Sequence, residues 1–215
     1  MTALVVLSGG MDSVTALAWA HHLHGTVDAL TVDYGQRHRR EIDAARRQAT
    51  VYARNHDVVD LSGVGALLSG SALTDDVEVP TGHYADETMR ATVVPNRNAI
   101  LANVAAGVAV ARGHDTLVLG VHSGDHAIYP DCRPEFVQAL TALLAVANYD
   151  PIRVEAPFLY ADKEAILRVG YALGVDYSNT WTCYVGGGRP CRECGSCVER
   201  EEAFDAYGAR DPLVA

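Results

Sequence analysis

Short apolar runs alternate along this chain with longer segments whose apolar residues recur every three or four positions. The short runs predict strands buried on both faces, and the longer segments predict amphipathic helices. The predicted strands cover residues 3–7, 26–35, 57–61, 115–121 and 152–158, and the predicted helices cover residues 12–25, 39–55, 96–113, 133–148 and 162–174. This alternation indicates an α/β fold with an open parallel sheet and helices on both faces.

Two segments depart from the alternation. Residues 62–92 are polar, glycine-bearing and weakly patterned, so we expect an irregular excursion there. Near Asn179 the alternation stops and a cysteine-rich tail begins, with a helix starting at Val198. We therefore divide the chain into an α/β domain of residues 1–178 and a C-terminal segment of residues 179–215.

The 215 residues are 49% hydrophobic and 20% charged, which suits one sizeable core. The formal net charge of -10 argues against a nucleic-acid partner, because such binding normally needs a basic surface. No apolar run reaches the roughly 18 residues of a membrane-spanning helix, and the N-terminal residues do not resemble a signal segment. We expect a cytoplasmic protein without a membrane partner.

The first strand-to-helix junction holds the candidate phosphate-binding loop. It consists of Ser8, Gly9, Gly10, Met11, Asp12 and Ser13. Glycines let backbone N–H groups approach an anion closely, and a helix N-terminus adds positive partial charge. Asp12 would repel a phosphate unless a divalent cation lies between them, or else it caps the helix. Neither the Walker pattern nor G-x-G-x-x-G is present. Capping alone would explain two glycines, whereas the complete string favours phosphate binding.

Four cysteines in the tail have the spacing C-x7-C-x2-C-x2-C. They are Cys183, Cys191, Cys194 and Cys197. Two overlapping C-x2-C steps can turn successive thiolates onto one ion, and a fourth thiolate completes a tetrahedral structural zinc site. An iron–sulfur cluster and a redox C-x2-C pair are the alternatives. Cys132 lies apart from them, as a small buried hydrophobe or as a nucleophile with no base nearby in the sequence.

Three further polar segments lie at predicted strand ends or helix starts, where an open α/β sheet binds its ligands. The segment VDYGQRHRREID carries Asp33, Tyr34, Gln36, Arg37 and His38, and its Arg39, Arg40 and Glu41 fit a solvated helix start. The segment VPNRN carries Arg97, beside asparagines that can cap a helix. The segment GVHSGDHAIYPDCRPEF carries His122, Asp125, Tyr129, Asp131 and Arg133. Lys163 starts another helix, either as an exposed lysine or as a cation over a phosphoryl group.

The string SGGMDS resembles the PP-loop of the ATP pyrophosphatase superfamily. That resemblance implies a Rossmann-like fold of the adenine nucleotide alpha hydrolase type, in which ATP is cleaved between its α and β phosphates. Together with VDYGQRHRREID, VPNRN, GVHSGDHAIYPDCRPEF, Asp162-Lys163 and TWTCY…PCRECGSC, the loop resembles the 7-cyano-7-deazaguanine (preQ0) synthase family. These stretches span residues 8–197.

The family resemblance implies a reaction and a set of cofactors. ATP adenylates 7-carboxy-7-deazaguanine, ammonia displaces AMP to form an amide, and a second ATP activates the amide oxygen so that loss of AMP leaves the nitrile. The resemblance implies ATP, Mg²⁺ and Zn²⁺ as cofactors and a homodimer as the assembly.

The predicted roles follow from this chemistry. Arg97, Arg133 and Lys163 supply cations to the carboxylate and the α-phosphate. The loop residues with Asp33 and Tyr34 bind ATP. Asp125 or Asp131 accepts hydrogen bonds from a guanine-type amine, in a substrate site with Gln36, Arg37, His38, His122 and Tyr129.

Two alternatives stay open from the sequence. Another PP-loop enzyme, a tRNA thiolase or a lysidine-type ligase, would usually carry an added RNA-binding domain or a basic surface. A non-catalytic nucleotide sensor would have no need for the polar segment after Val121.

Overall fold

The computed structural model describes residues 2–82, 90–122 and 129–214. Within them lies a parallel sheet of five strands in the order β3-β2-β1-β4-β5. The strands are β1 (Thr2–Val6), β2 (Thr26–Asp33), β3 (Asn55–Asp60), β4 (Thr116–Leu119) and β5 (Arg153–Glu155). The sequence-based fold class is confirmed.

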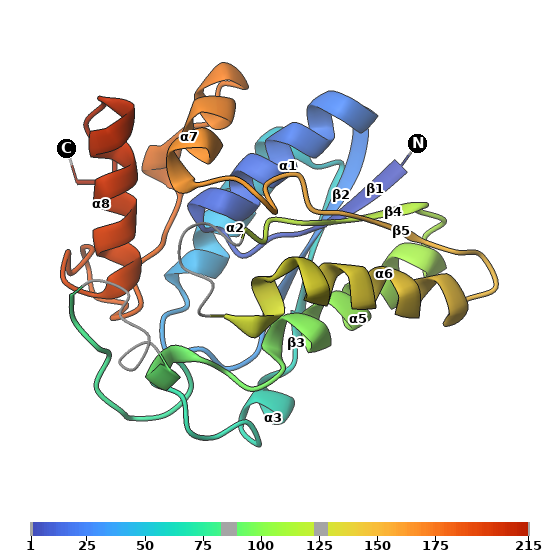
Figure 1. Ribbon diagram of the computed structural model, residues 1–215, viewed down its shortest axis with the longest axis horizontal. Helices are drawn as coiled ribbons and strands as arrows, with labels where there is room; N and C mark the ends of the chain where they lie inside the picture. The colour runs from blue at the N-terminus through green and yellow to red at the C-terminus, as the bar shows by residue number, and fades with distance from the viewer. Residues whose placement is uncertain (1, 83–89, 123–128, 215) are drawn as a thin grey trace.

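Helices cover both faces of this sheet (Figure 1). One layer contains α1 (Met11–His24), α2 (Arg40–Tyr52) and α7 (Lys163–Ala172), with α8 (Gly195–Tyr207) packed against α7. The other layer contains α5 (Arg97–Ala111) and α6 (Pro134–Val146). Shorter elements are α3 (Ser62–Gly65), η1 (Arg90–Thr92), η2 (Pro130–Cys132) and η3 (Tyr177–Asn179).

The central strand β1 shows why its sequence is wholly apolar. Val5 packs with Val14 and Leu17 of α1, whereas its neighbour Leu4 packs with Ala105 of α5 on the opposite face. Successive strand residues point to opposite faces, so a strand covered on both sides needs apolar residues at every position.

None of the described helices is long and apolar enough to cross a membrane.

Several element boundaries differ by a few residues from the sequence-based expectation, among them those of β5 and of the tail helix. Strand β5 spans only Arg153–Glu155, whereas residues 152–158 were predicted. Pro157 has no N–H for a ladder, and the backbone turns there through a hydrogen bond from Leu159 N–H to Ala156 C=O (3.2 Å). The tail helix begins at Gly195 instead of Val198, with Cys194 at its N-cap.

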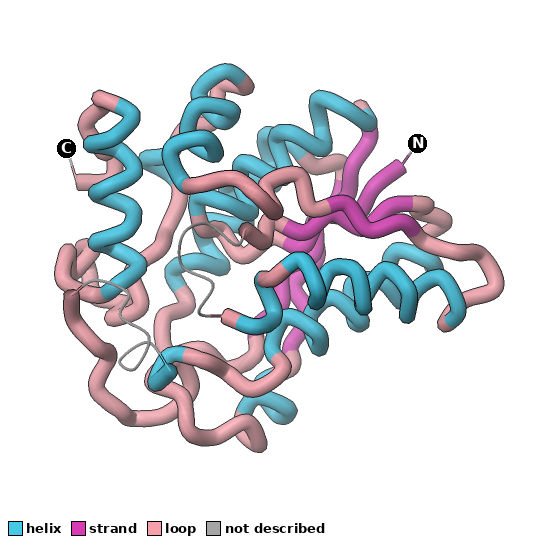
Figure 2. Tube along the Cα trace, viewed as in Figure 1, coloured by secondary structure: helices cyan, strands magenta, loops and turns pink. Residues whose placement is uncertain are grey.

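The long connections lie mainly at the lower left of the view, away from the N-terminal end of β1 (Figure 2). Because all five strands are parallel, the segments that follow β1, β2 and β4 leave the same edge of the sheet. Gly120, just after β4, makes this meeting close, since a Cβ there would lie 2.7 Å from Ser13 Cα. The glycine loop and the segments after β2 and β4 therefore converge.

Helix α8 is anchored through a buried arginine. The Arg200 guanidinium donates to both carboxylate oxygens of Asp211, at 2.8 and 2.9 Å, and to Tyr177 C=O at 3.1 Å. Arg200 is 3% exposed, and such a buried charge is stable only when it is fully paired. This anchor holds the first half of α8, which includes the adjacent Glu199, against the α/β core.

Candidate active site and candidate metal centre

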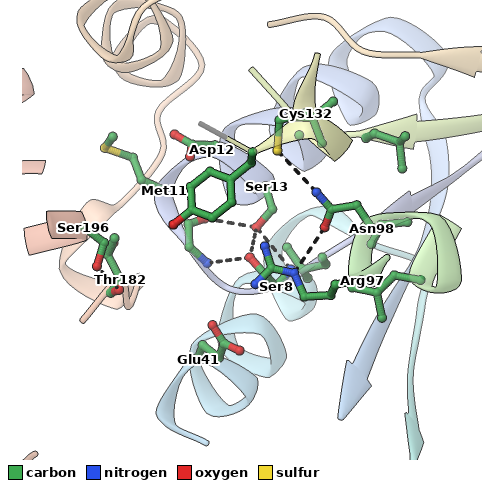
Figure 3. Close-up of a pocket in the computed structure, with 18 of the residues that line it drawn as sticks. Ser8, Met11, Asp12, Ser13, Glu41, Arg97, Asn98, Cys132, Thr182 and Ser196 are labelled. Atoms are coloured by element: carbon green, nitrogen blue, oxygen red, sulfur yellow. Dashed lines mark hydrogen bonds between the residues drawn. The ribbon is translucent and has the colours of Figure 1, made fainter. Parts of the chain in front are cut away.

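A cavity of about 260 Å³ opens at the carboxyl ends of β1, β2 and β4. Figure 3 shows side chains from distant segments around it, including Ser8, Arg97, Glu41 and Thr182. The predicted site residues that line it are Ser8, Gly10, Met11, Asp12, Ser13, Tyr34, Gln36, Arg97, His122, Tyr129 and Lys163. A largely apolar cavity with converging polar groups is the expected form of a small-molecule site.

The glycine loop is held by its own serine hydroxyls. Ser13 Oγ accepts from Ser8 N–H (3.2 Å) and Gly9 N–H (3.3 Å) and donates to Gly10 C=O (3.1 Å). Helix α1 starts directly after Gly10, and no side chain caps it. An uncapped helix start beside a cavity leaves N–H donors for an anion.

Gly9 must be glycine for two reasons. Its φ is +91°, and a Cβ there would lie 2.0 Å from Glu41 C=O and 2.7 Å from Ala45 N in α2. We expect Gly9→Ala to lower the free energy of unfolding by about 2–3 kcal/mol. Gly10→Ala is the matched control, because its Cβ would meet Ser8 Oγ at 3.4 Å and Trp181 C=O at 3.7 Å, with no close overlap. Urea denaturation of both variants tests this, and equal losses would contradict it.

Lys163 lies at the centre of a charged cluster beside the loop. Its Nζ donates to Asp12 Oδ2 (2.7 Å) and lies 3.3 Å from Glu199 Oε2, and His122 Nε2 lies 3.7 Å from the same Asp12 oxygen. Lys163 is also the only lysine in the chain, where every other strongly basic side chain is an arginine. An ammonium is a compact point charge, whereas a guanidinium is a planar fork of donors, so the geometry of this cation differs from that of every arginine in the chain.

Protonation in this cluster follows from burial and charge together. Burial opposes the charge on Lys163, but the carboxylates of Asp12 and Glu199 outweigh it and raise the lysine pKa. Burial likewise opposes ionisation of Asp12, and Lys163 and His122 outweigh it and lower the Asp12 pKa. Burial and Lys163 lower the pKa of His122, which favours the neutral ring. Asp12 Oδ1 is buried without a hydrogen-bond donor among the described residues, so it is available to a cation.

Arg97 brings a second cation to the cavity from the start of α5. Its guanidinium lies 5.9 Å from the centroid of the Tyr34 ring, and its Nε donates to Asn98 Oδ1 at 3.4 Å. No described carboxylate forms an ion pair with it. Arginine stays protonated in proteins, so this partly buried charge is suited to an anionic ligand.

Glu41, at the start of α2, is held by Gln36. Gln36 Oε1 accepts from Tyr34 N–H (2.9 Å), and its Nε2 donates to Glu41 Oε1 (2.9 Å). Burial raises the pKa of Glu41 to about 7, although Gln36 and Arg97 act in the opposite direction. A solvated helix start was the sequence-based interpretation of Glu41, and the structure corrects it, since this carboxylate is largely buried and lines the cavity.

This carboxyl makes stability depend on pH. Between its ordinary value of 4.5 and its folded pKa of about 7, the folded state binds more protons than the unfolded state, so stability falls as pH rises. Glu41→Gln removes that penalty. We expect the difference in free energy of unfolding between E41Q and the wild type to shift in favour of E41Q by about 2–3 kcal/mol from pH 5 to pH 8. Urea denaturation of both proteins at pH 5 and pH 8 measures this shift. A stability difference that is the same at both pH values would contradict the prediction.

Besides Gly9, five of the described predicted site residues lie outside the lining of the cavity. Asp33 pairs with Arg39, and Arg37 is bound to Val77 C=O (2.6 Å). The other three are buried His38, exposed Arg133 and Asp131, whose Oδ2 accepts from Asn98 N–H at 2.9 Å. Gly9 supports the loop from behind, and Asp125 lies outside the described residues.

Other lining residues were not predicted from the sequence. They are Thr31, Glu41, Asn98, Cys132, Trp181, Thr182, Tyr184, Ser196 and Glu199, among the polar and aromatic ones. Three of them, Trp181, Thr182 and Tyr184, flank the first tail cysteine in the string TWTCY, and that adjacency could have indicated them. Burial raises the pKa of Cys132 to about 12, so its thiol stays neutral, and its Sγ accepts from Asn98 Nδ2 at 3.3 Å.

The four tail cysteines form a compact cluster of free thiols. Their Sγ atoms all lie within 4.8 Å of one another, and three of the four residues, Cys183, Cys194 and Cys197, are buried, whereas Cys191 is half-buried. Backbone N–H groups of Cys191 and Cys194 donate to sulfurs of the cluster at 3.3 and 3.2 Å. Four converging sulfurs without disulfides are a donor set that can hold a metal ion.

The tail also forms part of the cavity wall. Trp181 N–H donates to Gly9 C=O (2.9 Å), and Ser196 Oγ donates to Thr182 C=O (2.9 Å). Trp181 packs in one cluster with the buried cysteines, and Arg40 of α2 stacks over its ring at 5.1 Å. The cysteine cluster therefore supports the wall that faces the glycine loop.

Comparison with known proteins identifies close relatives. The family model described as queuosine biosynthesis protein QueC matches residues 2–208. The chain is 53% identical to a 7-cyano-7-deazaguanine synthase of Marinobacter nauticus, with 99% of this chain and 96% of that protein covered. It is 49% identical to a protein of the same description from Ruegeria pomeroyi, with 99% and 93% covered.

Solved structures show the same fold at low identity. An NMN synthetase of Francisella tularensis matches with a TM-score of 0.51 and 12% identity, covering 97% of this chain and 77% of that one. An NH3-dependent NAD synthetase of Campylobacter jejuni matches with a TM-score of 0.50 and 14% identity, covering 83% and 66%. These likenesses concern the fold alone.

Proposed function

The chain belongs to the queuosine biosynthesis protein QueC family, and on that premise we propose how it makes 7-cyano-7-deazaguanine. The observation that carries this function is the near full-length identity of about one half to proteins described as 7-cyano-7-deazaguanine synthase. It is an enzyme, and the cavity at the glycine loop is the proposed place of its chemistry.

The proposed reaction uses two molecules of ATP for each product. The carboxylate oxygen of 7-carboxy-7-deazaguanine attacks the α-phosphorus of ATP and pyrophosphate leaves. Ammonia then attacks the activated carbon, loses a proton, and releases AMP to form the amide. The amide oxygen attacks the α-phosphorus of a second ATP and a second pyrophosphate leaves. Loss of AMP with the two remaining N–H protons then leaves the nitrile.

The loop and the uncapped start of α1 support a role in holding the pyrophosphate. Backbone N–H groups at a helix N-terminus stabilise anions without a lysine on the terminal phosphate. The free, buried Oδ1 of Asp12 fits Mg²⁺, which prefers carboxylate oxygen and phosphate ligands. When bound, Mg²⁺ would neutralise charge on the departing pyrophosphate.

The two cations of the cavity are proposed to act on two different anionic groups. Lys163, held by Asp12 and Glu199, is proposed to stabilise charge that develops at the α-phosphate. Arg97, which has no described carboxylate partner, is proposed to orient the carboxylate of the substrate. Arg133 keeps its predicted catalytic role only as a prediction, because its side chain is exposed.

The cysteine cluster is proposed to hold Zn²⁺. Four sulfurs within 4.8 Å fit a closed tetrahedral site, which has no open position for substrate. We assign this ion to the support of the cavity wall. We further propose a cytoplasmic homodimer that acts on small molecules, and sedimentation velocity tests the dimer.

One incubation tests the function. Purified protein is mixed with ATP, Mg²⁺, ammonium and 7-carboxy-7-deazaguanine, without RNA, and products are separated by liquid chromatography. We expect two AMP and two pyrophosphate for each 7-cyano-7-deazaguanine. ADP with orthophosphate would overturn the proposed chemistry, whereas a sensor would form no AMP and a tRNA-modifying enzyme would require RNA.

A further inference from the structure

Three carboxylates line the described part of the cavity, and two of them are already paired. Asp12 and Glu199 both bind the Lys163 ammonium. Among the described residues, Glu41 forms no ion pair with a lysine or an arginine, and the basic group that lies close to it is His38 Nε2, 3.9 Å from Oε2. Burial lowers the pKa of His38 to about 4, so this imidazole is neutral. Glu41 is therefore the lining carboxylate that remains available to a ligand.

The carboxylate of Glu41 is held in a defined orientation. Gln36 is 3% exposed, and both ends of its amide are used, one on Tyr34 N–H and the other on Glu41 Oε1. The backbone of Glu41 lies directly against Gly9, which holds the start of α2 on the loop. A carboxylate accepts about four hydrogen bonds, and Gln36 takes only one. Both oxygens can still accept from a ligand.

The surroundings of Glu41 suit a flat ring. Tyr34, Trp181 and Tyr184 line the same cavity. Figure 3 shows the Glu41 carboxylate directed to the space between Thr182 on one side and Ser8 and Arg97 on the other. Aromatic walls favour a planar heterocycle, and one fixed carboxylate at such a wall can read the edge of that ring.

We propose that Glu41 is the specificity-determining residue of the substrate site, accepting hydrogen bonds from the ring N–H and the adjacent exocyclic amine of the guanine-type substrate. These two neighbouring donors match the two carboxylate oxygens. This inference rests on the proposed function for the class of substrate, and it assigns Gln36 to positioning Glu41. The sequence-based candidate Asp131 instead holds the start of α5 through Asn98 N–H.

The energetic consequence is discrimination against rings that lack the amine. A carboxylate as buried as that of Glu41, which is 16% exposed, keeps the cost of desolvation without the compensating bond when it loses its donor. Sites built to bind one polar group reject the analogue without it strongly, so we expect at least about 100-fold here.

The test compares two substrates on two proteins. Wild type and Glu41→Gln are assayed with 7-carboxy-7-deazaguanine and with its analogue lacking the exocyclic amine. We expect the wild type to prefer the first in kcat/KM by about 100-fold or more, and E41Q to prefer it by less than about 10-fold. Asp43→Asn, an exposed change on the same helix, should keep the wild-type ratio.

Calorimetric titration of both rings without ATP separates this inference from the proposed function. The measured quantity is the Kd of the analogue divided by the Kd of 7-carboxy-7-deazaguanine. If this ratio is the same in E41Q and the wild type, the proposed role of Glu41 is overturned, whatever the nucleotide products are. A ratio that falls in E41Q while wild type forms no AMP leaves the role of Glu41 supported and overturns the proposed reaction. If E41Q does not fold, Glu41→Asp withdraws the carboxylate by one methylene and should reduce the ratio in the same direction.

Discussion

Lys163→Met is expected to lower kcat for 7-cyano-7-deazaguanine formation by about 10³-fold, the largest effect of any single substitution in the cavity. Lys163 Nζ lies 2.7 Å from Asp12 Oδ2 in the loop, beside the proposed phosphate site. Methionine fills similar space without a charge, so negative charge at the α-phosphate would lose its counter-ion. Pyrophosphate release, followed in single-turnover experiments, measures the adenylation step directly.

Loss of folding has to be separated from loss of catalysis in this variant. Without the ammonium, Asp12 and Glu199 stay partly buried and lose their shared partner, which destabilises the fold. The double variant Lys163→Met with Glu199→Gln removes one of these charges and should recover part of the lost stability without recovering activity. Recovery of activity in the double variant, or near wild-type pyrophosphate release in the single one, would contradict the role of Lys163.

The lysine content of this chain gives an independent check. Because Lys163 is the only lysine, an amine-specific reagent has one side-chain target besides the N-terminal amine. We expect ATP with Mg²⁺ to protect Lys163 from modification, as read by mass spectrometry of peptides.

Cys194→Ser is expected to lose the metal ion that we propose for the cysteine cluster and to weaken ATP binding by at least about tenfold. A structural zinc site contributes several kcal/mol to folding, so the melting temperature should fall by about 10 °C or more. ATP binding falls because Cys194 directly precedes α8, which carries Ser196 and Glu199 into the cavity. Elemental analysis, thermal denaturation and ATP titration measure the three effects.

The matched control for metal content is Cys132→Ser. Cys132 contacts Asn98 and takes no part in the tail cluster, so this variant should keep its metal. A Cys194→Ser protein that loses its metal and still binds ATP as tightly as the wild type would show that the tail does not support the nucleotide site.

Local patterns predicted most of the fold. The apolar strand before Ser8 and the helix after Gly10 follow from residues that are neighbours in the chain, as does the tail cluster, whose last three cysteines lie within seven residues. Strand β5 was overestimated because its apolar character continues past the residues that pair, and Pro157 lies where the turn begins.

Partners that are distant in the chain could not be predicted in this way. Asp12 and Lys163 are 151 positions apart, and Glu199 reaches the same ammonium from a helix that was assigned only to the tail. Glu41 follows three basic residues and is typical of a solvated helix start, yet the close packing of α2 on Gly9 buries it.

The sequence by itself determined the class of fold, the candidate phosphate-binding loop and the four cysteines that could hold a metal, because each depends on spacing within a short segment. Only the tertiary structure decided which charges pair, which carboxylate stays available and that the tail closes the cavity. The physical reason is that pairing and burial depend on which strand ends meet at one edge of the sheet. That meeting brings Lys163 to Asp12 and leaves Glu41 lining the cavity.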